Sequence, residues 1–271
     1  MTVYFIGAGP GAADLLTLRA VERIHSSPVC LYAGTYLDAE VLRHCPPGVL
    51  AIDTQHLDLD HITEHLVDAH LRGQDVARLC SGDPSLYSAL SEQTRRLDAA
   101  GVPWDVVPGV PAYAAAAAVL RRELTVPEVA QSVVLTRTHA RSTAMPATES
   151  LAAFARTRAT LVLHLAITRT RILAAELALE YGPDCPVAVV ASVSTPSQVV
   201  LRGTLADIAD QVEEAGLRQA AVIVVGPALT AGNFPDSHLY DARRARHGDV
   251  ACATFVDAST NVGTVGSGPG D

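Results

Sequence analysis

The sequence predicts an α/β protein built from two α/β domains whose sheets are mainly parallel. Short apolar runs rich in β-branched residues alternate with longer segments that are apolar at helical spacing, a pattern typical of strands joined by crossover helices. The chain has 271 residues, 49% of them hydrophobic but only 4% aromatic. A core made mostly of alanine, valine and leucine suits helices lying against sheets, and this length can bury one large core or two ordinary ones.

The first half of the chain alternates strands and helices in a βαβ pattern. Ile62 and Leu66, for example, share one face of an expected helix, and a short apolar run that ends at Cys80 follows it. The expected strands are residues 2–6, 28–32, 49–52, 75–80 and 101–107, and the expected helices are residues 14–24, 36–44, 59–71 and 86–97. This alternation predicts a parallel sheet covered by helices.

A second α/β set follows a junction at residues 108–111. It begins with a helix that contains five consecutive alanines, which favour helix formation and close backbone approach. Its expected helices are residues 111–123, 150–155, 168–181 and 205–214, and its expected strands are residues 131–136, 159–165, 186–191, 199–203 and 220–225. We therefore expect an N-terminal domain at residues 1–110, a C-terminal domain at 111–230 and a tail at 231–271 that is mobile or extraneous.

Charge and cysteine content exclude several classes of function. The formal net charge is −9, opposite to the usual sign for a protein that binds nucleic acid in bulk. The five cysteines are far apart without a C-x-x-C motif, which favours reduced thiols in a reducing compartment, so we expect a cytoplasmic protein. No apolar run approaches 18 residues and no basic leader is evident, so we expect neither a membrane span nor a signal peptide.

Residues 79–87 are the stretch around which we interpret the rest of the chain. A strand is expected before Gly82 and a helix after it, so Gly82 provides a turn, Asp83 suits the helix cap and Pro84 suits the first helical position. This stretch alone is compatible with a purely structural βα turn. Similar small or polar loops follow other expected strands at residues 7–11, 108–113, 137–146 and 165–168. Ligands of parallel α/β sheets bind beyond the carboxyl ends of strands, so these loops could converge on one cleft.

Two further motifs are weaker. Gly7, Gly9 and Ala12 match the spacing of a dinucleotide fingerprint, but the next strand ends without the acid that would bind a ribose, and Pro10 removes an amide donor. We expect these glycines to turn the chain and expect no NAD binding. His61 and His65 are spaced as metal ligands on a helix can be, yet no local carboxylate or cysteine completes a site, so we expect a solvated helix face and no metal. No motif marks a serine or cysteine nucleophile.

Four segments together resemble the tetrapyrrole (corrin/porphyrin) methylases. They are residues 3–17 (VYFIGAGPGAADLLT), 81–87 (SGDPSLY), 107–116 (VPGVPAYAAA) and 202–205 (RGTL). Residues 30–34 (CLYAG) and 124–129 (LTVPEV), with Thr136-Arg137 and Met145-Pro146, resemble the branch of that family that methylates C11 of precorrin-4 in cobalamin biosynthesis. The resemblance covers residues 3–229.

The resemblance implies two α/β domains with S-adenosyl-L-methionine bound in a cleft between them, a tetrapyrrole polycarboxylate as substrate, and a homodimer. Carried over by motif, the residues expected at the methyl donor are Pro10, Ser81, Gly82, Asp83, Leu86, Pro111, Ala112, Leu165, Val193 and Gly226. The chain departs from the branch at residues 191–195, where an Arg-Ala-Ser type of segment is expected. It also departs at Pro111-Ala112, where Ser-Ser or Thr-Ala is common.

Methyl transfer of this kind needs no protein nucleophile, because a sulfonium methyl group is already electrophilic and positioning can supply most of the rate. Arg137, His139 and Arg141 lie on one loop and could bind the substrate's carboxylates, or could form an ordinary solvated basic loop. Three alternatives stay open at this level. The substrate could be methylated at another ring carbon or contain cobalt, it could lie outside the tetrapyrroles, or the protein could bind a tetrapyrrole or the methyl donor without catalysis.

Overall fold

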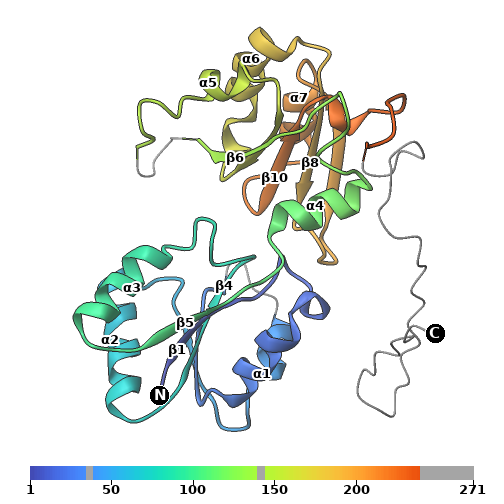
Figure 1. Cartoon of the computed structure of the whole chain (residues 1–271). Helices are drawn as coiled ribbons and strands as arrows, with labels where there is room; N and C mark the ends of the chain where they lie inside the picture. The colour runs from blue at the N-terminus through green and yellow to red at the C-terminus, as the bar shows by residue number, and fades with distance from the viewer. Residues whose placement is uncertain (35–38, 139–143, 239–271) are drawn as a thin grey trace, which may run out of the picture. The chain divides into compact units, whose positions relative to one another are not determined.

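The computed structural model, drawn in Figure 1, describes residues 1–34, 39–138 and 144–238. Residues Met1–Phe234 form one compact unit that contains two five-stranded sheets. Within the described residues, no helix combines the length and apolar character needed to cross a bilayer. The division into domains at residue 110, and the expected properties of the tail, stay predictions.

The first sheet is wholly parallel, as the sequence predicts, with the strand order β3-β2-β4-β1-β5. Its strands are β1 (Val3–Gly7), β2 (Val29–Tyr32), β3 (Leu50–Asp53), β4 (Val76–Cys80) and β5 (Trp104–Val107). Its helices are α1 (Leu18–Ser26), α2 (Leu59–Leu71) and α3 (Leu90–Ala99), with 3-10 turns at Ala13–Leu15 and Ala39–His44. Every residue of β4 is buried because helices cover both faces of the sheet.

The strand order creates a switch point between β1 and β4. The chain leaves β1 toward β2 on one side and leaves β4 toward β5 on the other, so the crossover helices lie on opposite faces. Accordingly, Ile24 of α1 packs in one buried cluster of residues, whereas Leu66 of α2 and Leu97 of α3 pack in another. The loops that follow β1 and β4 therefore diverge at their carboxyl ends, where open α/β sheets bind ligands.

The second sheet has the strand order β6-β7-β10-β8-β9. Its strands are β6 (Val133–Arg137), β7 (Thr160–His164), β8 (Pro186–Ala191), β9 (Val199–Thr204) and β10 (Ala221–Val225). Its helices are α4 (Ala112–Leu120), α5 (Leu151–Ala155), α6 (Thr170–Tyr181) and α7 (Ile208–Glu214), with 3-10 turns at Ile167–Arg169 and Pro227–Leu229. Helix α4 packs on one face through Ala116 and Leu120, and α6 packs on the other through Leu173 and Leu177.

The second sheet is mixed, and this refines the expected arrangement of mainly parallel strands. Only β6 and β7 pair in parallel, while the other three pairs are antiparallel. The reason is visible in the loop between β8 and β9. Residues 192–198 are too few for a crossover, so the two strands must form a hairpin. Strand β10 then enters between β7 and β8 and runs against both of them.

Helix α3 also begins later than the sequence predicts. The periodicity of residues 86–97 predicts a helix from Leu86, but the helix begins at Leu90. Tyr87 and Ala89 have φ angles of +54° and +53°, which lie outside the right-handed helical region. Asp83 and Pro84 therefore do not cap α3, and residues 81–89 form a separate loop at the end of β4.

Candidate functional site

Three glycines bring the ends of three adjacent strands into backbone contact. Gly7 ends β1, Gly82 follows β4 and Gly109 follows β5. A Cβ atom on Gly109 would lie 2.3 Å from the carbonyl oxygen of Gly82, and one on Gly7 would lie 2.4 Å from the amide nitrogen of Gly109. Only glycine allows this approach, so we call these three residues the glycine floor.

The loops that leave the glycine floor are joined by hydrogen bonds. The Gly82 amide donates to the carbonyl oxygen of Gly9 at 2.7 Å, and the Gly9 amide donates back to the carbonyl oxygen of Gly82 at 3.2 Å. The Gly109 amide donates to Oδ2 of Asp83 at 2.8 Å. The Ser85 amide donates to Oδ1 of Asp83 at 2.8 Å, and the Ser85 hydroxyl bonds the same oxygen. Asp83 therefore ties the loop after β4 to the loop after β5.

The environment of Asp83 keeps its carboxylate ionised. Partial burial raises the pKa of Asp83, but the bonds from the Ser85 hydroxyl and from the amides of Gly109 and Ser85 outweigh that effect. Its pKa accordingly lies below the ordinary value for an aspartate. The site carries a fixed negative charge at neutral pH.

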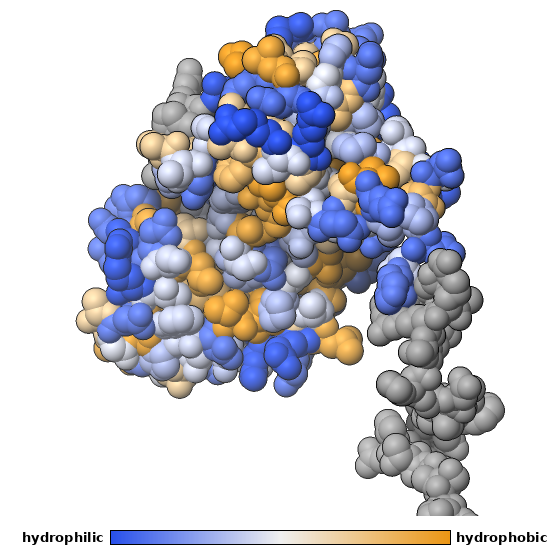
Figure 2. Space-filling view, turned by 45° about the horizontal axis from the view of Figure 1, so that its top comes forward, coloured by the Kyte–Doolittle hydropathy of each residue, from blue (hydrophilic) through white to orange (hydrophobic). Residues whose placement is uncertain are grey.

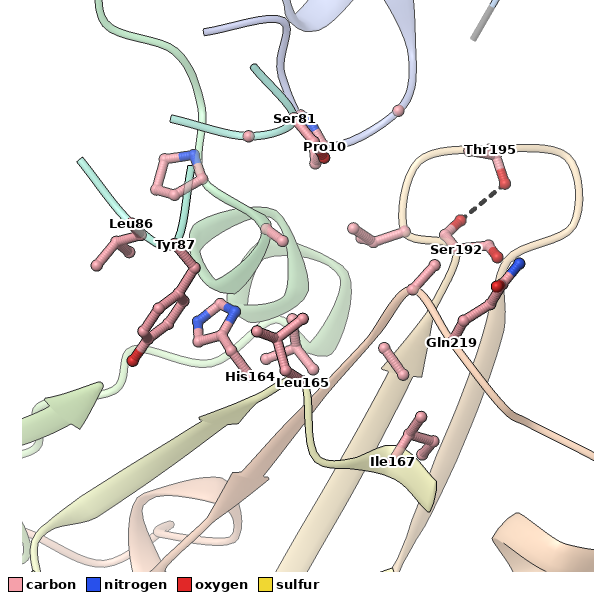
Figure 3. A pocket seen from close by; sticks show the side chains of 18 of the residues that line it. Pro10, Ser81, Leu86, Tyr87, His164, Leu165, Ile167, Ser192, Thr195 and Gln219 are labelled. Atoms are coloured by element: carbon pink, nitrogen blue, oxygen red, sulfur yellow. Dashed lines mark hydrogen bonds between the residues drawn. The ribbon is translucent and has the colours of Figure 1, made fainter. Parts of the chain in front are cut away.

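A pocket of about 540 Å³ opens beside these loops. This volume lies within the range of small-molecule sites in proteins. Its lining combines the loops after β1 and β4 with residues of the second sheet, as Figure 3 shows for Pro10, Ser81, His164 and Ser192. On the face drawn in Figure 2, apolar surface gathers in and around a hollow between areas of hydrophilic surface.

Strained backbone concentrates in the wall of this pocket. Tyr87, Leu165, Ser192 and Ala220 line it, and their φ angles lie between +47° and +54°. Non-glycine residues in this region cost about 1–3 kcal/mol each and persist where the surrounding structure fixes them. Leu165 is also 63% exposed although it is a large apolar residue. A strained and exposed leucine in a pocket wall indicates a surface built to contact a ligand.

Contacts between the two sheets' loops close one side of the pocket. The Ala12 amide, which follows β1, donates to the hydroxyl of Ser194 at 3.0 Å. A Cβ atom on Gly11 would lie only 2.6 Å from the Thr195 side chain, so the β8–β9 loop packs directly on this backbone. The Thr195 hydroxyl in turn donates to the carbonyl oxygen of Ser192 at 2.8 Å (Figure 3). Both sheets must therefore be in place for the pocket to exist.

Three rings meet on the other side of the pocket. Tyr87 lies beside His164 with ring centroids 5.6 Å apart (Figure 3), and Tyr113 of α4 meets the same imidazole edge-on at 6.5 Å. Burial lowers the pKa of His164, so its imidazole is neutral at physiological pH. The position of His164 at the end of β7 places it next to Arg137, its partner in β6.

The structure brings most of the residues expected at the methyl donor into this one pocket. Those that line it are Pro10, Ser81, Gly82, Asp83, Leu86, Pro111, Ala112, Leu165 and Val193. Gly226 does not line it. Its amide donates to the carbonyl oxygen of Pro186 at the start of β8, away from the pocket, because β10 runs antiparallel to its neighbours. The opposite end of β10 supplies Arg218, Gln219 and Ala220 instead.

The expected substrate loop is only partly described. Arg137 is the last residue of β6, while His139 and Arg141 lie outside the described residues. Among the pocket residues that the sequence reasoning missed, Tyr87 and His164 adjoin predicted ones, but no pattern marks them. Arg218 and Gln219 could have been found only by recognising that β10 is antiparallel.

Among the residues that the structure describes, the helical histidine pair belongs to no cluster of metal-ligating side chains. His61 bonds the carboxylate of Asp58, the residue that caps α2, with 2.7 Å between Nδ1 and Oδ1. This bond is the main reason that the pKa of His61 is raised. Within residues 1–34, 39–138 and 144–238, no group of three or more His, Cys, Asp or Glu side chains is arranged to hold a metal.

Comparisons with known proteins agree on one family. Residues 2–209 match the model of the tetrapyrrole (corrin/porphyrin) methylases. A precorrin-4 C(11)-methyltransferase of Rhodococcus erythropolis is 59% identical over 91% of this chain and 99% of its own length. A cobalt precorrin-4 methyltransferase structure is 34% identical with a TM-score of 0.82, covering 85% of this chain and 96% of that one.

A third relative bears on the pocket. The structure of uroporphyrin-III C-methyltransferase from Thermus thermophilus, solved with S-adenosyl homocysteine, is 29% identical with a TM-score of 0.71. The match covers 84% of this chain and 99% of that one. With two α/β sheets, a pocket at the switch point of the first and a family match over most of its length, this chain belongs to the tetrapyrrole (corrin/porphyrin) methylases.

Proposed function

We propose that this protein transfers a methyl group from S-adenosyl-L-methionine to C11 of precorrin-4, giving precorrin-5, as a step of cobalamin biosynthesis. The observation that carries the proposal is the 59% identity, over nearly the whole length of both chains, with a precorrin-4 C(11)-methyltransferase. The identity to the cobalt precorrin-4 enzyme is only 34%, which favours the substrate without cobalt.

The pocket is the proposed site of the methyl donor. Its apolar surfaces, from Leu86, Leu165 and Val193, suit the adenine and the carbon chain of this molecule. The ionised carboxylate of Asp83 supplies negative charge near a ligand that carries a sulfonium and an ammonium group. The relative solved with S-adenosyl homocysteine shares this fold and supports the assignment.

The protein's part in the reaction is to position the two substrates and exclude water. A sulfonium methyl group and an electron-rich ring carbon react in line without a covalent intermediate on the protein. The close approach at the glycine floor and the Asp83 bonds support a role for Pro10, Ser81 and Ala112 in positioning the donor. Arg137, together with His139 and Arg141 of the following loop, is proposed to bind the carboxylates of the tetrapyrrole, where arginine can bond bidentately.

Assembly and location complete the proposal. We propose a homodimer, supported by Ile172 and Leu179, which are 58% and 84% exposed at heptad spacing on α6. A cytoplasmic location is supported by the free thiols of the cysteines in the described part of the chain. Analytical ultracentrifugation tests the homodimer, and a protein that is monomeric at every concentration measured would contradict it.

The decisive experiment is incubation of purified protein with precorrin-4 and methyl-labelled donor. We expect one labelled methyl group per product by mass spectrometry, and NMR should place it on C11. A methyl group on another carbon would show that C11 is not the position that this protein methylates. Binding of S-adenosyl homocysteine without turnover of any tetrapyrrole would instead indicate a binding module.

A further inference from the structure

His164 has a buried nitrogen that the fold leaves unpaired. Its Nε2 atom is inaccessible to solvent and has no hydrogen-bond partner among the described residues. His70 on α2 also has a buried ring nitrogen with no partner in the part of the chain that the structure describes, so an unpaired nitrogen alone does not define a site. His164 differs because it lines the pocket and belongs to the same wall as strained Tyr87 and Leu165.

The surroundings of His164 favour the neutral imidazole, which can accept a proton, over the charged imidazolium. The rings of Tyr87 and Tyr113 flank it, and Arg137 on the neighbouring strand is the charged side chain at its register position. Burial is the cause that lowers the pKa of His164, with no carboxylate contributing. A neutral imidazole keeps one nitrogen lone pair, and the face of a tyrosine ring can stabilise the imidazolium that forms when that lone pair takes a proton.

Asp83, the carboxylate of the same pocket, is poorly suited to this task. Both of its oxygens already accept hydrogen bonds from Ser85 or Gly109. These bonds lower its pKa, which makes it a weaker base than an imidazole.

We propose that His164 accepts the proton that the tetrapyrrole loses when it is methylated, an inference that rests on the proposed function. The bond between the methyl carbon and sulfur breaks with its electron pair going to sulfur, which yields S-adenosyl homocysteine. The electron pair of the ring carbon forms the new carbon–carbon bond, so the ring system gains one positive charge. Transfer of a ring N–H proton to Nε2 of His164 removes that charge, and the imidazolium later releases the proton to water.

Tyr87 is a partly exposed neighbour of this imidazole. Its ring centroid lies 5.6 Å from that of His164 and the residue is 45% exposed, so we expect this side chain to turn aside when the tetrapyrrole binds. Hydrogen bonds of a general base often form only when substrate is bound, which fits an unpaired nitrogen in the ligand-free protein.

The test compares two substitutions of His164 with the same change at His70. His164→Phe keeps a ring between Tyr87 and Tyr113 but has no nitrogen, while His164→Gln keeps an acceptor that does not titrate. General base catalysis contributes about 100-fold or more. We expect both variants to lose kcat by about that factor and to bind S-adenosyl homocysteine within twofold of wild type by calorimetry. His70→Phe should keep wild-type kcat.

The pH profile and rescue separate proton transfer from packing. Wild-type kcat should fall as pH drops through the lowered pKa of His164, and this limb should be absent in both variants. Imidazole added to His164→Gly should restore turnover in proportion to its concentration.

The inference would be overturned if His164→Phe had the kcat of the wild type, or if the variants kept the wild-type pH profile. Either result would leave the proposed function standing. A folded His164→Gln protein that no longer binds S-adenosyl homocysteine would also overturn the inference, because His164 would then be a donor-binding residue. Absence of wild-type turnover would overturn both proposals together. If His164→Phe fails to fold, the Gln variant and the imidazole rescue decide.

Discussion

Replacing Asp83 with asparagine should show whether Asp83 joins the loops after β4 and β5 or is an ordinary surface residue. The two carboxylate oxygens face opposite partners: Oδ2 accepts from the Gly109 amide and Oδ1 accepts from the Ser85 amide, both at 2.8 Å. An asparagine has one oxygen and one NH₂ group. Whichever way the amide is turned in Asp83→Asn, a donor faces a donor on one side.

The magnitude follows from the bond that is lost. A hydrogen bond to a charged group contributes about 1.5–3 kcal/mol, and the partial exposure of Asp83 favours the lower end of about 1.5 kcal/mol. In a chain of this size each kcal/mol shifts the melting temperature by about 2–4 °C, so a fall of about 3–6 °C is expected. Because Gly109 leads into Pro111 and Ala112 of the pocket, affinity for S-adenosyl homocysteine should fall by about tenfold, or 1.4 kcal/mol.

The assay is thermal unfolding with and without S-adenosyl homocysteine, beside calorimetry. Asp14→Asn, at an exposed position outside the pocket lining, is the matched control and should change neither quantity. The lowered pKa of Asp83 means that its contribution is complete above the unfolded pKa of about 3.9 and is lost as pH falls through the folded value. The difference in stability between the variant and the wild type should therefore begin to shrink at about pH 4 and vanish below the lowered pKa of folded Asp83. An Asp83→Asn protein with wild-type stability and affinity at pH 7 would refute this reasoning.

The remaining predictions concern the glycine floor, the pocket wall, Arg137 before the expected substrate loop, and the C-terminal tail. Gly109→Ala should lower the free energy of unfolding by about 3 kcal/mol in denaturant titrations, because its Cβ meets the Gly82 carbonyl at 2.3 Å, whereas Gly232→Ala, which has no described neighbour closer than 3.9 Å, should be neutral. Leu165→Gly should relieve a strained φ and leave the melting temperature equal or higher, while the affinity for S-adenosyl homocysteine falls. A lower melting temperature of this variant would contradict the prediction. Arg137→Ala should raise KM for the tetrapyrrole without changing donor affinity, and an equal loss of both would place this residue at the donor instead. A chain ending at Gly248 should keep its melting temperature and turnover, and unfolding of that chain would show that the tail packs on the core.

The sequence predicts the elements well because hydrophobic spacing decides them locally. Helix α2 and strand β8 begin and end where the apolar pattern predicts, and most other boundaries shift by a few residues. The start of α3 could not be predicted, since the apolar spacing from Leu86 continues through Tyr87 and Ala89, whose positive φ angles no apolar pattern indicates. Strand direction in the second sheet is likewise a tertiary property, apart from the short hairpin after Ala191.

The candidate site was predictable where a motif carries it and not elsewhere. Pro10, Ser81 and Pro111 lie in segments whose glycines and prolines are unusual enough to be recognised. His164 ends a strand like any other polar residue, and only the fold brings it against Tyr87 and Tyr113. The partners of Asp83 were also hidden, because Gly109 lies 26 residues away along the chain.

The bond between the Ala12 amide and the Ser194 hydroxyl couples ligand binding to the stability of the protein. It crosses the seam where loops of the two sheets form one pocket, so a bound ligand resists any opening of that seam. A ligand at 100 times its dissociation constant adds about 2.7 kcal/mol of apparent stability. Proteolysis that depends on opening of this seam should therefore slow when the methyl donor is bound.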